Sequence, residues 1–380
     1  MTFSPIDLQH LAVIQTAICV CNDPIVKIME ERLETPLYLL TSESLKQCIK
    51  VKTPPKVPQT FEGELMKLLR PISLEIERWK EDHSRIIDTR QDFTNYFVWK
   101  NLGVIDKQAT ARALIESDRL LDVKHRFALA CFYCFEDSIM TLWQEISPLG
   151  KTRIICRSEI VRVWKYHLES GREVNDEFYF WALRDDNPSA TCYLLSKLTP
   201  EECDTFLRDV PYKTFPISNN VLVFCYTQMD DNSQAIMLER HPLKMLLWFL
   251  NWPLQSLFLR KMDTAYEYLS EKEFQSILLF ILLERILTEW HDFDYVHILK
   301  RFWNQSPSKF KRYVLQGIYG RMFQKILDHD WTESLPKNFL PYSVQLLCSQ
   351  YRLKYVENNY KLRRKTYIDL VAGNTPTFSG

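Results

Sequence analysis

A short pattern recurs along this chain: an apolar helical run ends at an acidic or asparagine pair, and a second helix starts directly after it. Clear corners lie at Asn22-Asp23 and Glu136-Asp137, and looser ones at Asp185-Asp186 and Asp230-Asp231. The spacings from Asp137 to Asp186 and from Asp186 to Asp231 are 49 and 45 residues, close to the ~40 to 47 residues of some helix-pair repeats. The pattern predicts an all-α fold of stacked helix pairs, an α-solenoid or similar repeat array, after an irregular N-terminal portion. The alternative is an all-helical fold in which such corners recur without repetition.

Length and composition favour the same class. The chain has 380 residues, more than the roughly 250 to 300 that one core organises, so we expect two lobes or an elongated array. Its 8 glycines are too few for glycine-rich phosphate loops or many tight β-turns. Basic and acidic residues both number 48, so no overall charge favours nucleic acid or an acidic membrane surface, although a local patch stays open.

Cysteines and apolar segments indicate the compartment. The ten cysteines are spread through apolar helical segments, as is typical of reduced core residues. The first ten residues lack the basic start and apolar core of a signal peptide. The apolar stretches at 245–259 and 277–283 fall short of the ~20 apolar residues that span a bilayer. We therefore expect a cytoplasmic protein without a membrane span, and the basic run at 361–365 leaves a nuclear location open.

A cluster of prolines suggests the domain boundaries. Three prolines between residues 53 and 60 favour extended backbone and interrupt any helix. We predict an N-terminal helical cap at 1–52, a proline-rich linker or turn at 53–60, a helical repeat body at 61–368 and a flexible tail at 369–380. Pro71 predicts a kinked or broken helix in the body.

Local signals predict several helix ends. Asp106 and Asp122 can act as N-caps, and Gly171 can close a helix in the left-handed conformation. The sequence Thr199-Pro200-Glu201-Glu202 combines a capping hydroxyl, a first-turn proline and a glutamate at the third position, so it predicts a helix start. Residues 221–226 are β-branched and aromatic, which fits a strand, but their place in the recurring pattern favours a helix.

Two stretches resemble ankyrin repeats. The first contains Ser4-Pro5, His10-Leu11-Ala12 and Ile25-Val26-Lys27-Ile28-Met29, and the second contains Leu129-Ala130-Cys131 and Ile139-Met140-Thr141-Leu142. The family's Thr-Pro-Leu-His sequence and the glycine between its helices are absent, and the spacing exceeds its roughly 33 residues. The resemblance implies stacked helix pairs and protein binding. No functional residue transfers, because that family binds through variable surface positions.

The segment 291–297 holds the densest set of metal-ligand side chains. His291, Asp294 and His297 are spaced three apart, so they could share one helix face and bind a metal ion. The alternative, which we favour, is that the acidic residues cap a helix. We therefore expect no metal and no cofactor.

The acidic corners and a tryptophan-rich segment are the candidate partner-binding sites. Neighbouring acids diverge on a helix, which favours capping and solvation over acid–base catalysis. If the corners stack, Asp137, Asp186 and Asp231 would form an acidic edge for a basic partner. Trp248 and Trp252 flank a dense aromatic segment that could form an apolar groove.

No nucleotide-binding glycine fingerprint, phosphate loop or hydrolase motif occurs in the chain. We therefore expect a non-enzymatic scaffold or adaptor whose partner is another protein, with no role for nucleic acid. The alternative is a helical enzyme or metal-binding protein with an unrecognised site near residues 291–297. The partner's identity and the oligomeric state stay open.

Overall fold

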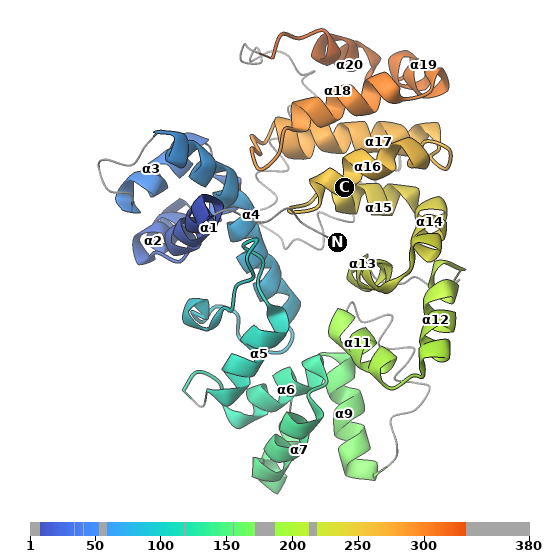
Figure 1. Cartoon of the computed structure of the whole chain (residues 1–380). Coiled ribbons are helices and arrows are strands. Elements are labelled where there is room, and N and C mark those ends of the chain that lie inside the picture. Colours follow the sequence, from blue (N-terminus) through green and yellow to red (C-terminus); the bar gives the residue numbers. More distant parts are fainter. Residues whose placement is uncertain are drawn as a thin grey trace, which may run out of the picture. The chain divides into compact units, whose positions relative to one another are not determined.

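The computed structural model describes residues 8–33, 35–40, 42–52, 59–117, 119–154, 156–171, 187–212 and 219–331. Every regular element in these ranges is helical (Figure 1). One isolated antiparallel bridge joins Trp99 to Ile105. The predicted all-α class is confirmed.

The chain divides into two compact units. Unit 1 combines residues 1–73 with 241–380, and unit 2 comprises 74–240. This division differs from the predicted boundaries, because α4 (Gln59–His83) begins inside the predicted linker and continues past residue 73. The helix passes through Pro71, where we expected a kink or a break. Residues 53–58, most of the predicted linker, and 369–380, the predicted tail, lie outside the described residues.

The N-terminal part of unit 1 contains four α-helices and a short 3-10 turn. These elements are α1 (Leu8–Cys21), α2 (Pro24–Leu33), η1 (Leu37–Leu39), α3 (Ser42–Lys52) and the first half of α4. Helix α1 packs against α2 and α3. Asp23, at the corner between α1 and α2, is buried and accepts a hydrogen bond from the Ile25 amide at 2.8 Å. This acid therefore starts the second helix of the pair.

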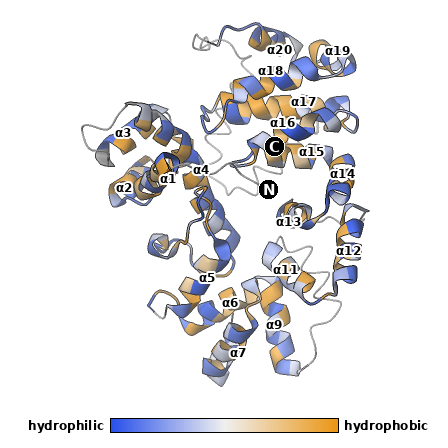
Figure 2. Ribbon diagram, viewed as in Figure 1, coloured by the Kyte–Doolittle hydropathy of each residue, from blue (hydrophilic) through white to orange (hydrophobic). Residues whose placement is uncertain are grey.

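The C-terminal part of unit 1 forms successive helical layers, yellow to orange in Figure 1. They are α15 (Pro242–Phe249), α16 (Gln255–Ala265), α17 (Glu271–Ile281), the π-helical turn η4 (Leu282–Ile286), α18 (Tyr295–Gln305), α19 (Ser308–Gln316) and α20 (Gly320–Leu327). Helix α17 packs against α15, α18 and α19, and α19 packs against α20. The Phe274 ring stacks on Phe302 and Phe310 with centroids 4.8 Å apart in each case. Figure 2 shows the hydrophobic residues of α15 to α17 where these helices face one another.

Unit 2 is arranged around α6 (Val123–Tyr133). Besides the second half of α4, the elements described in this unit are η2 (Thr94–Tyr96), α5 (Lys107–Glu116), α7 (Glu136–Glu145), α8 (Pro148–Thr152), α9 (Glu159–Ser170), α11 (Pro188–Ser196), α12 (Pro200–Asp209), η3 (Val210–Tyr212), α13 (Asn219–Gln228) and α14 (Asp231–Arg240). Helix α6 packs against α5, α7, α9 and α11, and its residues 127–131 are all buried. It is therefore the core helix of this unit.

The predicted helix ends are confirmed. Asp106 and Asp122 accept hydrogen bonds from the amides of Ala109 and His125, and Gly171 ends α9 with φ of 66°. Thr199 and Glu202 form a reciprocal capping box at the start of α12. Residues 221–226 belong to the helix α13.

None of the described helices alone is both long and apolar enough to cross a bilayer. Helices α1 and α2, bent by 56° at their junction, meet the length and composition requirement only as a pair.

Candidate functional site

The corner aspartates that the sequence predicts as partner contacts lie on separate helix pairs. Asp137 is in the first turn of α7, which packs on α6, and Asp231 is the first residue of α14, which packs on α13. Both side chains are exposed. Neither carboxylate has a hydrogen bond or ion pair with another part of the chain that the structure describes. Asp186 lies outside the described residues.

The acid preceding each of these aspartates has an internal partner. The Glu136 carboxylate accepts a hydrogen bond from the Tyr193 hydroxyl and lies 2.8 Å from the Lys197 ammonium. These contacts lower the pKa of Glu136. Asp230 accepts a hydrogen bond from the Ser233 amide at 2.7 Å and so caps α14, which lowers its pKa. In both pairs the first acid stabilises the fold and the second faces solvent.

The two tryptophans predicted to line an apolar groove are only partly accessible. Trp248 and Trp252 are half-buried, and the Trp248 ring lies 5.2 Å from that of Phe249. Both residues have a further interaction as well. The dense aromatic segment thus packs largely on its own neighbours.

The three predicted metal-ligand residues lie at the start of α18. His291, Asp294 and His297 are all exposed. Asp294 caps α18 by accepting a hydrogen bond from the His297 amide at 2.8 Å. Across the described ranges no three histidine, cysteine or acidic side chains are grouped so that they could hold a metal ion.

Asp292, one residue from His291, occupies a different environment. Its side chain is buried, and its Oδ2 accepts hydrogen bonds from Gln255 Nε2 at 2.7 Å and from the Tyr295 hydroxyl at 3.1 Å. Its Oδ1 has no hydrogen-bond partner among the described residues. Burial raises the pKa of Asp292 to about 6, although the Arg285 charge and the two hydrogen bonds oppose the shift.

Arg285 is the buried cation of this network. It lies in the π-helical turn η4 and donates hydrogen bonds to the carbonyl oxygens of Leu250 at 3.3 Å and Glu284 at 3.0 Å, and to Asn251 Oδ1 at 3.1 Å. All three acceptors are neutral. No carboxylate of the described residues forms an ion pair with Arg285, so the oriented dipoles of these three groups face its guanidinium.

Aromatic rings complete the surroundings of this guanidinium. Arg285 Cζ lies 4.8 Å from the ring centroids of Phe280 and Trp290, and 5.8 Å from that of Tyr295. Desolvated cation–π contacts of this kind stabilise a buried guanidinium. We call Arg285, Asp292, Gln255 and Tyr295, with Asn251, the Asp292 network.

The connection that carries the Asp292 network also holds the N-terminal helices in unit 1. Glu289, which has a left-handed φ of 59°, accepts hydrogen bonds from the Ser42 hydroxyl at 2.6 Å and the Ser42 amide at 3.1 Å. Arg70, from α4, donates to the carbonyls of Thr288 and Leu40. Its guanidinium lies 3.8 Å from the Glu289 carboxylate. The start of α3 and the middle of α4 are therefore joined to the segment after η4.

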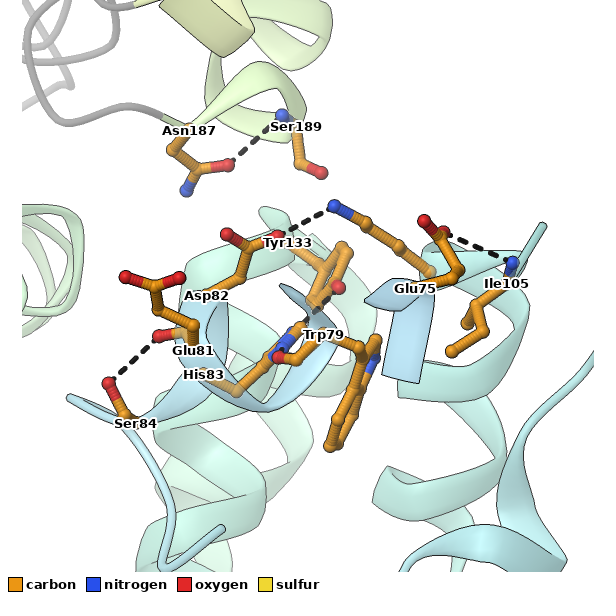
Figure 3. A network of polar contacts seen from close by, with 11 residues as sticks. Glu75, Trp79, Glu81, Asp82, His83, Ser84, Ile105, Tyr133, Asn187 and Ser189 are labelled. Carbon is orange, nitrogen blue, oxygen red and sulfur yellow. Dashed lines mark hydrogen bonds and ion pairs between the residues drawn. The ribbon is translucent and has the colours of Figure 1, made fainter. Parts of the chain in front are cut away.

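A second buried polar network lies in unit 2, around His83 at the end of α4 (Figure 3). His83 Nδ1 lies 2.6 Å from the Trp79 carbonyl oxygen, and Nε2 lies 2.7 Å from the Tyr133 hydroxyl. A carbonyl oxygen only accepts, so Nδ1 carries the proton and Nε2 accepts from Tyr133. Burial lowers the pKa of His83 to about 4, and the imidazole is neutral at neutral pH.

Rings and ion pairs enclose this His83 network. The imidazole stacks on Trp79 with ring centroids 4.2 Å apart and on Tyr133 at 5.6 Å. Beside it, Asp82 lies 2.6 Å from the Lys107 ammonium. Figure 3 also shows Glu75 on the same helix, accepting the Ile105 amide hydrogen bond at 3.2 Å. Both ring nitrogens of His83 are used, which leaves this histidine no free position for a ligand.

Sequence reasoning missed both networks. Asp292 belongs to the candidate metal segment 291–297, but the predicted ligands were the three exposed residues His291, Asp294 and His297. The neighbouring residues carry no signal for its burial, since both Asp292 and the exposed Asp294 stand next to the aromatic Phe293. Comparison with protein-family models, with curated proteins and with solved structures finds no match for this chain.

Proposed function

We propose that this protein is a non-enzymatic scaffold or adaptor that is built from stacked helix pairs and binds another protein. The observation that carries the proposal is that three polar corners each join two helices that pack on each other, α1 with α2, α6 with α7 and α13 with α14. Helix pairs that pack on sequence neighbours build arrays whose outward side chains are available to partners.

The exposed corner aspartates are the proposed contact points. Asp137 and Asp231 each follow an acid that already serves the fold, and each carries a solvated negative charge. A charge near a helix N-terminus stabilises the helix only modestly. Carboxylates without an internal partner are suited to lysine or arginine side chains of a basic partner, where they would govern association rate and specificity.

The test is a matched pair of charge reversals. Asp137→Lys with Asp231→Lys changes the charge by the same amount as Glu116→Lys with Glu239→Lys, two exposed acids on other turns of unit 2. A photoreactive amino acid at the exposed Met140, one turn from Asp137, would report the partner in the native cell. We expect a defined protein adduct that the corner reversal reduces about tenfold and the control reversal leaves intact. Equal adducts with both variants would contradict the corner assignment.

The buried Asp292 carboxyl favours a second candidate, a helical enzyme or small-ligand protein that uses the segment 291–297. A buried acid with a free oxygen and a pKa of about 6 can exchange a proton near neutral pH. Native mass spectrometry of the protein purified from its own cell would test this candidate. A small molecule retained by the unmodified chain and lost from Asp292→Asn would favour it over the scaffold, whereas protein partners alone would exclude it.

A further inference from the structure

The segment from residue 295 to 327 has the strongest charge asymmetry of the described chain. It contains seven basic residues and no acidic one: Lys300, Arg301, Lys309, Lys311, Arg312, Arg321 and Lys325. The chain as a whole has a formal net charge of zero, so the rest carries an equal excess of acids. Overall neutrality therefore conceals a local basic region on α18, α19 and α20.

These cations are not neutralised within the described residues. None of the seven forms an ion pair there. Lys311 donates to the Asn304 carbonyl at 2.9 Å, and Arg301 to Gln305 Oε1 at 3.1 Å, and both acceptors are neutral. Lys309, Arg312, Arg321 and Lys325 are exposed on the two helices α19 and α20, which pack on each other. We call these helices with their turn, residues 308–327, the basic hairpin.

The turn of the basic hairpin presents an aliphatic side chain. Ile318 is 89% exposed, more than any other large hydrophobic residue in the described part of the chain. Leu315 and Tyr313, at the end of α19, are exposed as well. The opposite faces of the two helices are buried through residues such as Phe310 and Phe323. The outward face thus combines cations with an apolar tip.

Backbone packing builds this tip. The Gly317 amide closes α19 by donating to the carbonyl oxygens of Tyr313 at 3.1 Å and Val314 at 3.3 Å, and the Gly320 amide donates to the Gly317 carbonyl at 3.0 Å. A Cβ at position 320 would collide with the backbone carbonyl of Leu315. The tight turn therefore needs glycine at 320, and it holds Ile318 at its outer end.

We propose that the basic hairpin docks on a lipid bilayer surface that carries anionic headgroups. Lysine and arginine side chains beside a membrane are attracted to its negative surface potential, and an exposed aliphatic residue between them can enter the boundary between headgroups and acyl chains. The positive charge of the basic hairpin favours a bilayer with anionic headgroups over one with neutral headgroups. Ile318 is the most exposed apolar side chain of the hairpin, which favours lipid. Tyr313 is the hairpin's one exposed aromatic ring, whereas single-stranded nucleic acid is bound by stacking of successive bases on several rings.

Flotation of the full chain with vesicles tests the proposal. Vesicles of phosphatidylcholine with about one-third phosphatidylserine should carry the protein at about 0.1 M salt, and vesicles of pure phosphatidylcholine should not. Ile318→Ser should weaken binding about tenfold. Arg321→Glu with Lys325→Glu should weaken it about twentyfold or more, since each cation near the surface contributes about fivefold.

Matched controls separate the hairpin from general surface effects. Lys46 and Lys50 are exposed and four residues apart on α3, like Arg321 and Lys325 on α20, so Lys46→Glu with Lys50→Glu should leave binding unchanged. Leu149→Ser removes an aliphatic residue that is also exposed and should leave binding unchanged too. The basic run at 361–365 is tested by exchanging its cations for glutamine, which should leave the dependence on Ile318 intact.

Hydrogen exchange on the unmodified protein provides a second measurement that does not depend on variants. Anionic vesicles should slow exchange in peptides covering 313–321 and leave those covering α6 unaffected. The proposal is overturned if the unmodified chain ignores anionic vesicles, if the hairpin variants float like the unmodified chain, or if no protection appears at 313–321. Hairpin-dependent binding of polyuridylate without vesicle binding would also overturn it, in favour of nucleic acid.

Discussion

The two buried polar networks keep an ionisable group away from water in opposite ways. In unit 2 both nitrogens of His83 have partners, Trp79 and Tyr133, and the neutral imidazole satisfies every hydrogen bond it can make. In unit 1 Asp292 has two donors on one oxygen and none among the described residues on the other. Every hydrogen-bonding atom of the His83 imidazole therefore has a partner, whereas Asp292 Oδ1 has none among the described residues and can accept a proton.

The difference also appears in how each network is assembled. The His83 network begins with a contact inside one helix, because the Trp79 carbonyl is four residues before the histidine. The Asp292 network joins three segments: Leu250 and Asn251 after α15, Gln255 on α16 and the connection from η4 to α18. A network that depends on separate segments is more sensitive to any change in their packing.

Removal of the buried cation should have the largest effect. Arg285→Ala leaves the Asn251 amide oxygen without its donor, and it leaves the Leu250 carbonyl only the 3.4 Å hydrogen bond from the Tyr295 hydroxyl. It also removes the charge that favours ionised Asp292. We expect unit 1 to lose about 3 to 5 kcal/mol of unfolding free energy, as is typical when one member of a buried charged network is deleted. Denaturant unfolding followed by hydrogen exchange would measure the loss in each unit.

The matched control for this prediction is Arg260→Ala. Arg260 is exposed on α16, and its removal should change stability by less than about 0.5 kcal/mol. A loss below about 1 kcal/mol for Arg285→Ala would show that the network contributes little to unit 1.

Acidification should move the stability of the two units in opposite directions. The folded-state pKa of His83 is about 4, below its ordinary 6.5, so the unfolded chain binds more protons and unit 2 loses stability as pH falls from 6.5 to 4. The folded-state pKa of Asp292 is about 6, above its ordinary 3.8, so folded unit 1 binds more protons and gains stability as pH falls from 6 to 4.

Each contribution is on the order of 3 kcal/mol across its whole pH window. Hydrogen exchange at several pH values, resolved for peptides of α6 and α16, would measure both trends. His83→Gln and Asp292→Asn are the controls, and each should reduce the pH dependence of its own unit only. The lowered pKa values of Glu136 and Asp230 leave a residual dependence in unit 2. Parallel trends in the two units would refute the assignment of opposite pKa shifts.

Removal of one hydroxyl from each network compares them directly. Tyr133→Phe leaves His83 Nε2 buried without a donor, and we expect a loss of about 2 kcal/mol. Tyr295→Phe leaves Asp292 Oδ2 still bonded to Gln255, so the expected loss is about 1 kcal/mol. Thermal unfolding of the two variants would measure both losses. A larger loss for Tyr295→Phe than for Tyr133→Phe would contradict the conclusion that the His83 network is the more completely hydrogen-bonded of the two.

The smallest effect is expected at the link to the N-terminal helices. Glu289→Gln keeps an acceptor for the Ser42 amide but removes the charge that faces Arg70 at 3.8 Å. Because Glu289 is half exposed, the expected loss is about 0.5 kcal/mol. Faster exchange of the α3 amides with unchanged exchange in α17 would locate the effect, and faster exchange throughout unit 1 would contradict a local role.

Local sequence signals predicted the helical class and many helix boundaries. Asp106, Asp122, Thr199 and Gly171 act within three or four residues along the chain, and a pattern of that range is visible in the sequence. The acid-free stretch from 295 to 327 was equally visible, but the balance of 48 basic and 48 acidic residues over the chain obscured it. Charge counted by segment would have found the basic hairpin.

The sequence by itself determined the all-α class and most helix ends, because capping and helical periodicity depend on neighbours along the chain. Only the tertiary structure decided which polar residues are buried. His291, Asp292 and Asp294 are similar in sequence context, yet Asp292 alone is enclosed, by Gln255 and Tyr295. Residues 1–73 and 241–380 likewise form one unit through contacts such as that between Arg70 and Glu289, more than two hundred positions apart. Burial results from packing between distant segments, and no local pattern encodes it.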